Sequence, residues 1–341
     1  MWRILICALL SLPFQAWSGD GWHVGNPIQK GRLTIYPLLG PAEGPVGNYL
    51  TLDEGVEAGT VKVGELGTLV ASRMIRTPGS APGVARDASR VNELALVNNS
   101  DRPLLLLAGE IVSGGKQDRV VARDRIVPPH SDPVPLGVFC VEPGRWRGLS
   151  MEFVAAKLMA HPELRKQAVV AQDQQKVWDE VASSRSAMAV TVTAAPTAIN
   201  TSTSSYAGTA KASAVEQKVE LDASSFLPKL PEDALGMVVA VDGRLVWADA
   251  FPNSALFRRY RTKLLQSYVV ESYRAASANA GPPSSADVEK FLRMLGGRQN
   301  IEVEPDLYRL VRSEADGLVT FELEALGVKG AQRLHFARMV K

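Results

Sequence analysis

The sequence has few of the residues that build disulfides and metal centres. Its 341 residues include 2 cysteines and 4 histidines. Cys7 lies in an N-terminal apolar run that we expect to be removed, so the mature chain keeps Cys140 alone and cannot form an internal disulfide. No two histidines have the spacing of a metal-binding pair; they are His23, His130, His161 and His335. We therefore predict no metal site and no cofactor.

The sequence also has no clear excess of positive or negative charge. The chain has 38 Lys and Arg against 36 Asp and Glu, a net charge of +2. This balance gives no indication of a nucleic-acid partner or of an anionic membrane surface. The basic cluster "FRRYRTK" (257–263) is interpreted as a solvated helix face. Beyond the N-terminus no apolar run reaches the length of a membrane span, so no stable membrane insertion of the mature chain is expected.

The first 18 residues, "MWRILICALLSLPFQAWS", have the pattern of a secretory signal peptide. Arg3 precedes a short apolar run, and the small residues Ala16 and Ser18 mark a cleavage site near Ser18–Gly19. The apolar run is too short to span a bilayer as an anchor. We therefore expect an exported protein, periplasmic or extracellular, whose mature part begins at about residue 19.

The mature chain predicts an α+β fold with an antiparallel, strand-rich core and several helices in the second half. Strands are expected at 31–40 and 69–75. Three further strands, 103–113, 118–127 and 133–142, are separated by turns rich in glycine and proline, which predicts an antiparallel meander. Helical spacing of apolar residues follows within 161–182, so residues 19–182 form a strand-rich region with a helix at its end.

Residues 183–225 are rich in Ala, Ser and Thr and predict a flexible loop, with an ordered surface excursion as the alternative. Residues 226–341 return to regular structure and are expected to pack on the first region as one domain. The expected elements are a hairpin at Asp242–Gly243, a long helix capped by Asn253 or Ser254, a shorter helix from Ser284–Ser285, a hairpin at Asp316–Gly317 and a final strand over 333–340.

The meander brings charged residues to one predicted edge. The candidate ligand-binding residues are Gly114, Gly115, Lys116, Gln117, Arg119, Arg145 and Trp146, and the acid/base candidates are Glu110 and Glu142. Consecutive glycines can present backbone N–H groups to an anion, and arginine can clamp a phosphate or carboxylate. The same charges can instead neutralise one another and brace the turn, and the sequence leaves both readings open. A Cys140–His130 dyad is excluded because the third strand separates the two residues by about 20 Å.

Several of these motifs also carry a family resemblance. "LAGEIVSGGKQDRVV" followed by "VFCVEPGRWRG" resembles a bacterial domain family named for its association with ADP-ribosylglycohydrolase and rhodanese-phosphatase proteins. "KVWDEVA" and "VVAVDGRLVWADAFPNSALFRRYRTKLLQSYVVES" are similar to later blocks of that family. The resemblance implies a link to ADP-ribose or nucleotide pathways and no settled activity.

Three functional hypotheses follow. The first is an exported, soluble binding or interaction module for an anionic small molecule or an acidic group of a protein partner. The second is a hydrolase of an ADP-ribose-like or other phosphorylated substrate, with Glu110 or Glu142 as acid/base and Arg119 and Arg145 on the phosphates. The third treats the charged edge as a structural brace, with the function elsewhere.

Overall fold

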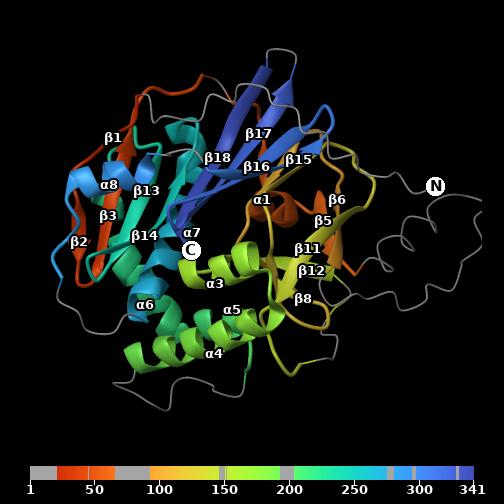
Figure 1. The fold of residues 1–341 in the computed structure, drawn as a ribbon. Coiled ribbons are helices and arrows are strands. Elements are labelled where there is room, and N and C mark those ends of the chain that lie inside the picture. Colours follow the sequence, from red (N-terminus) through yellow and green to blue (C-terminus); the bar gives the residue numbers. More distant parts are fainter. Residues whose placement is uncertain are drawn as a thin grey trace, which may run out of the picture.

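The computed structural model describes residues 21–44, 46–65, 93–145, 150, 152–192, 203–274, 280–293, 297–327 and 330–341 (Figure 1). The predicted signal peptide, the strand expected at 69–75 and Trp146 lie outside these residues. The described part contains three β-sheets and the helices that cover them, so the α+β prediction is confirmed.

The largest sheet has nine strands and is built from the two ends of the chain. Its order is β1-β3-β13-β14-β18-β17-β16-β15, with β2 paired to β3, and every pairing is antiparallel. Its strands are β1 (His23–Val24), β2 (Ile28–Lys30), β3 (Leu33–Leu39), β13 (Gly236–Val241), β14 (Arg244–Ala250), β15 (Arg298–Glu304), β16 (Tyr308–Ala315), β17 (Leu318–Gly327) and β18 (Gly330–Val340).

The segment between β3 and β13 contains a closed six-stranded barrel and a small sheet. The barrel order is β11-β6-β5-β12-β8-β9, and the small sheet has the order β10-β7-β4. The barrel strands are β5 (Val61–Gly64), β6 (Glu93–Asn98), β8 (Glu110–Gly114), β9 (Arg119–Val121), β11 (Val134–Cys140) and β12 (Glu152–Met159). The small sheet contains β4 (Leu50–Thr51), β7 (Leu104–Leu106) and β10 (Arg125–Val127).

The predicted meander is present in part, because β8, β9 and β11 are consecutive antiparallel neighbours in the barrel. Two of its strands are interrupted, however. Gly109, with φ +95°, separates β7 from β8, and residues 122–124 separate β9 from β10. As a result, β7 and β10 leave the barrel and pair with each other in the small sheet.

The helices of the described residues lie after residue 161, apart from α1 (Leu52–Glu57). The helix expected within 161–182 is broken at Gln172, which has φ +51°, into α3 (Pro162–Lys166) with the π-turn η1 (Gln167–Ala171) and α4 (Gln174–Thr191). The other helices are α5 (Tyr206–Ala210), α6 (Ser213–Ser224), the 3-10 turn η3 (Leu227–Lys229), α7 (Ser254–Tyr273) and α8 (Ser285–Leu292). None of the helices in the described residues is long and apolar enough to cross a membrane.

The segment 183–225 differs from the flexible loop that its composition predicts. Helix α4 continues to Thr191, and α5 and α6 occupy most of the described residues after 203; residues 193–202 lie outside the description. Val215, Val219 and Ala223 are four residues apart on α6 and all are buried. Small apolar side chains at helical spacing are enough to hold this helix against the core.

The large sheet, the helices and the barrel pack in layers, with buried apolar side chains between them. One face of the large sheet packs on α8, and the opposite face packs on α7, which separates the sheet from the barrel (Figure 1). Inside the barrel, Val63, Leu96, Val121 and Val138 belong to a second cluster. The space between sheet and barrel therefore holds the main core, and charged side chains buried there have to find partners across the layers.

Candidate functional site

The double glycine of the predicted site is shaped by packing. Gly114 has φ +134° and Gly115 has φ +49°, and a Cβ on Gly115 would lie 2.2 Å from the ring of Phe153. The backbone N–H of Gly114 donates to Asp118 Oδ1 at 3.1 Å, and that of Gly115 donates to Ser150 Oγ at 3.4 Å. The donors that would cradle an anion are thus engaged within the protein.

The charges beside these glycines contact one another. Arg145 Nη2 lies 2.5 Å from Glu142 Oε2, while the Arg145 Nη1 group donates to the carbonyl of Gly115 at 3.1 Å. Gln117 Nε2 donates to the carbonyl of Glu142 at 2.9 Å, and Arg119 Nη1 donates to Gln117 Oε1 at 3.2 Å. Gln117, Arg119 and Glu142 are buried. This turn cluster has the geometry expected of a brace, and its role in ligand binding stays a prediction.

Glu110 does not join that cluster. It begins β8 whereas Gly114 ends it, so the strand separates them by about 13 Å. Glu110 is 1% exposed, accepts from the backbone N–H of Leu107 at 2.8 Å and pairs with Lys263 on α7. Lys263 also lies 2.9 Å from Asp53 of α1. The Glu110–Lys263 ion pair therefore links the barrel to α7. The prediction that residues 257–263 form a solvated helix face is wrong for Lys263, which is buried.

The sequence predictions missed a buried charge network between sheet and barrel. His335 on β18 lies between two aspartates: its Nδ1 is 2.5 Å from Asp124 Oδ2 and its Nε2 is 3.1 Å from Asp249 Oδ1. Arg165 of α3 forms two hydrogen bonds with Asp249, at 2.8 and 3.0 Å, and Tyr268 of α7 donates to the same carboxylate. All five residues are buried.

The network fixes its own protonation state. Burial alone would lower the pKa of His335, but the charges of Asp124 and Asp249 outweigh burial and raise it to about 9. Burial disfavours the charge of Asp249, and the Arg165 guanidinium more than compensates, so the pKa of Asp249 falls well below its usual range. At neutral pH His335 is therefore a cation and lies, with the Arg165 guanidinium, against the ionised Asp249. Both imidazole nitrogens are engaged, so His335 has no ring nitrogen left for a substrate proton.

Because Gly109 has no side chain, the Arg165 side chain can pass close to the backbone there and reach Asp249. A Cβ on Gly109 would lie 2.6 Å from Cγ and 2.8 Å from Cδ of Arg165. The adjacent Ala108 donates its backbone N–H to Asp124 Oδ1 at 2.7 Å. The "LAGE" motif therefore serves two networks: Ala108 and Gly109 contact the Asp124–Arg165 side, and Glu110 contacts Lys263. This role was hidden in the sequence because the partners lie in distant segments.

A cavity of about 280 Å³ opens beside this network. Its lining includes Arg123, Asp124, Arg165 and Trp247, with apolar side chains around them. The Arg165 guanidinium stacks on the Trp247 ring at 4.3 Å. Arg165 Nε and Trp247 Nε1 are buried and have no acceptor among the described residues. We call this space the arginine cavity. Its lining includes N–H donors that have no acceptor among the described residues, and the half-exposed Arg123 at its rim is paired with Glu302 at 2.6 Å.

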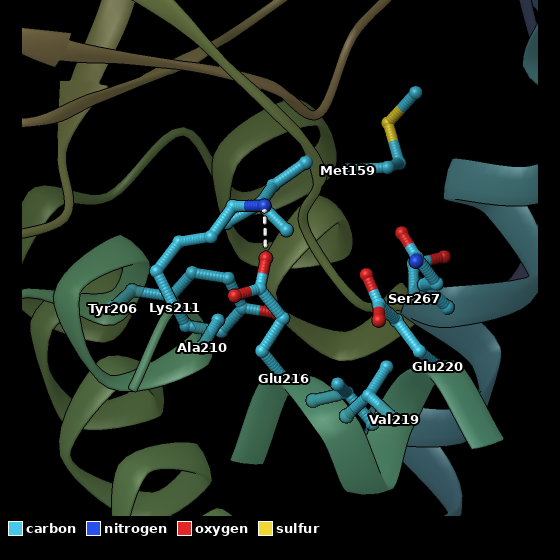
Figure 2. Close-up of a pocket in the computed structure, with 11 residues that line it drawn as sticks. Met159, Tyr206, Ala210, Lys211, Glu216, Val219, Glu220 and Ser267 are labelled. Atoms are coloured by element: carbon cyan, nitrogen blue, oxygen red, sulfur yellow. Dashed lines mark hydrogen bonds and ion pairs between the residues drawn. The ribbon is translucent and has the colours of Figure 1, made fainter. Parts of the chain in front are cut away.

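A second cavity, of about 370 Å³, has a different chemical character (Figure 2). Figure 2 shows Lys211 and Glu216 facing each other. Lys211 Nζ lies 2.6 Å from Glu216 Oε1, and Glu220 and Ser267 also line the cavity. Met159 and Val219 contribute apolar lining. Because the lining has two carboxylates and one ammonium that is already paired, this cavity is poorly suited to an anionic ligand.

Comparisons with known proteins give one match. The family model of the ARG and Rhodanese-Phosphatase-superfamily-associated Protein domain (ARPP-1) covers residues 21–337. No curated protein and no solved structure matches the chain. The match includes the turn cluster, every residue of the His335 network and the lining of the arginine cavity except Met339.

Proposed function

Because the chain belongs to the ARPP-1 family, which is named for its association with ADP-ribosylglycohydrolase and rhodanese-phosphatase proteins, we propose that it is a binding module for an anionic group on a small molecule or on such a partner. The arginine cavity carries this proposal. It offers two buried N–H donors, Arg165 Nε and Trp247 Nε1, that have no acceptor among the described residues.

Unpaired buried donors favour an incoming acceptor. Leaving one such donor desolvated costs about 1–3 kcal/mol, which an anionic oxygen would recover. Asp124, the acid in the lining, is neutralised because its oxygens accept from Ala108 and from His335. The Arg123 guanidinium at the rim is paired with Glu302 at 2.6 Å, so an incoming anion would share or displace that carboxylate. The 280 Å³ of empty space includes open solvent, and the part that a water-sized group can enter is about 10 Å³, so the cavity can receive a single oxygen of a phosphate or carboxylate group but no whole nucleotide.

Binding is a better description of this geometry than hydrolysis. The expected acid/base candidates, Glu110 and Glu142, are paired with Lys263 and Arg145 and do not line the arginine cavity. His335 is held at both nitrogens. A binding module needs only the unpaired donors, whereas general acid/base catalysis needs a titratable group within reach of the substrate.

A thermal-shift series on the purified protein tests the proposal. Inorganic phosphate and ADP-ribose are expected to raise Tm, since a ligand that binds only the folded state stabilises it, by about 2.7 kcal/mol at a hundredfold excess over Kd. Adenosine, which carries no anionic group, is the matched ligand control. No shift with either anion refutes the proposal.

Two variants and one control locate the site. Arg123→Gln removes the rim charge and is expected to reduce the shift, while Arg244→Gln on an exposed part of β14 leaves it unchanged. Arg145→Gln tests the turn cluster, whose ligand role was predicted from the sequence. A shift that is lost with Arg145→Gln and kept with Arg123→Gln assigns binding to the turn and overturns the arginine cavity.

We propose in addition that the protein is exported, on the basis of the leader-like pattern of residues 1–18. Expression of the full chain in a bacterium, followed by fractionation and N-terminal sequencing, tests this. Recovery outside the cytoplasm with Gly19 as the first residue is the expected result. An uncleaved N-terminus on protein that stays in the cytoplasm contradicts it.

A further inference from the structure

Strand β15 forms an open edge of the large sheet. It is the last strand in the sheet order and pairs with β16 only, among the strands that the structure describes. All seven of its residues are exposed, and they include two large apolar side chains, Ile301 at 45% and Val303 at 55%. An edge of this length leaves a row of backbone N–H and C=O groups ready to pair with another strand.

We propose that a second copy of this chain pairs antiparallel with β15, so that two large sheets join across a two-fold axis through Ile301. Two strands of identical sequence that pair in this way have the axis perpendicular to the sheet, and opposite residues then lie on the same face. The axis through the central residue keeps all seven residues of β15 opposite a partner.

The charges of β15 fit this pairing. With Ile301 on the axis, Arg298 lies opposite Glu304 of the second copy, and this contact occurs twice. In the described residues neither side chain has an ion pair or hydrogen bond within its own chain, so both are free to make that contact. Ile301 meets its own copy on the axis, where its exposed apolar surface becomes covered. Opposite charges directly across two strands stabilise the pairing.

Charges on an edge strand can also serve to prevent association. That purpose does not require opposite charges at positions equally distant from the centre, and a strand with one sign of charge would serve it better. The arrangement of Arg298 and Glu304 is self-complementary in the antiparallel orientation, which is the property that a two-fold interface needs.

The test measures the mass of the purified full chain in solution by sedimentation equilibrium. The wild type is expected to dimerise. Arg298→Glu and Glu304→Arg each place like charges opposite one another at both contacts, and each is expected to raise the dimer dissociation constant about tenfold or more. The double variant Arg298→Glu/Glu304→Arg restores opposite charges and is expected to dimerise as the wild type does.

Mixing the two single variants gives the sharpest result. Each repels its own kind, but a pair made of one Arg298→Glu chain and one Glu304→Arg chain has opposite charges at both contacts. A tagged copy of one is therefore expected to retain the untagged copy of the other. Arg244→Glu, the same charge reversal far from β15, is the control and is expected to leave the mass unchanged.

Several results would overturn the proposal. They are a wild type that remains monomeric at all concentrations, single variants that dimerise as tightly as the wild type, and a mixture that forms no heterodimer while circular dichroism shows both variants folded. A dimer unaffected by every β15 variant would place the interface elsewhere and is equally contrary to it.

Discussion

Gly109→Ala tests whether the path of Arg165 past the backbone of residue 109 holds the two layers together. The new methyl group would lie 2.6 Å from Arg165 Cγ, and Arg165 cannot swing aside without breaking its two hydrogen bonds to Asp249. Alanine at φ +95° is also strained. The strain costs about 1–2 kcal/mol and the overpacking about 1–3 kcal/mol, so the free energy of unfolding is expected to fall by about 3 kcal/mol.

The control for backbone strain is Gly317→Ala. Gly317 has φ +75° in the β16–β17 turn, and an added Cβ meets nothing within 4 Å. Its cost is therefore the strain alone, about 1 kcal/mol. Urea unfolding followed by tryptophan fluorescence gives both values. Equal losses for the two variants would show that Arg165 makes room at no cost and would refute the reasoning.

A double-mutant cycle isolates the contact. In an Arg165→Ala background the atoms that crowd Gly109 are gone, so Gly109→Ala should then cost no more than Gly317→Ala does. Residues in direct contact show coupling energies of about 0.5–3 kcal/mol in such cycles. Additive effects of Gly109→Ala and Arg165→Ala would mean that the two residues do not constrain each other.

Three further predictions concern buried groups. His335 has a pKa raised from 6.5 to about 9 by folding, so its stabilisation is complete below pH 6.5 and is lost as pH rises through about 9; unfolding measured from pH 6 to 10 should show a loss of about 3 kcal/mol that His335→Gln abolishes. Glu110→Gln leaves the buried Lys263 ammonium with Asp53 alone and should cost about 3 kcal/mol in urea unfolding, of which Glu110→Gln/Lys263→Met should recover at least half. Burial raises the pKa of the Cys140 thiol, so a thiol reagent should label it only in denaturant, and rapid labelling of the native protein would contradict its position.

The elements that could be predicted from the sequence are those with a local cause. The turns at Asp242–Gly243 and Asp316–Gly317 need positive φ at both residues, and the structure gives φ of 49° and 73°, and 51° and 75°. Asn253 caps α7 through its side chain, as expected, because its oxygen accepts from the backbone N–H of Leu256. Each of these outcomes depends on a few adjacent residues.

The features that could not be predicted from the sequence depend on contacts between residues that lie far apart in the chain. Gly109 looked like part of one long strand, and the break there is needed by Arg165, which belongs to a later helix. Asp124, Asp249 and His335 each resemble a surface charge in their own segment. Only the pairing of β18 with β14 and the position of the barrel bring them together. Glu110 was misplaced for the same reason, since its partner Lys263 comes from α7.

The order of the large sheet has a consequence for the order in which the parts of the protein fold. The barrel strands all lie between residues 61 and 159, so their pairing closes short loops, whereas β3 pairs with β13, which lies some two hundred residues further along the chain. The last strand of the described residues, β18, supplies His335 and completes the network. Until β18 pairs with β14, Asp124 lacks its imidazole partner, so the chain should fold through an intermediate in which the barrel has formed and the large sheet is still open.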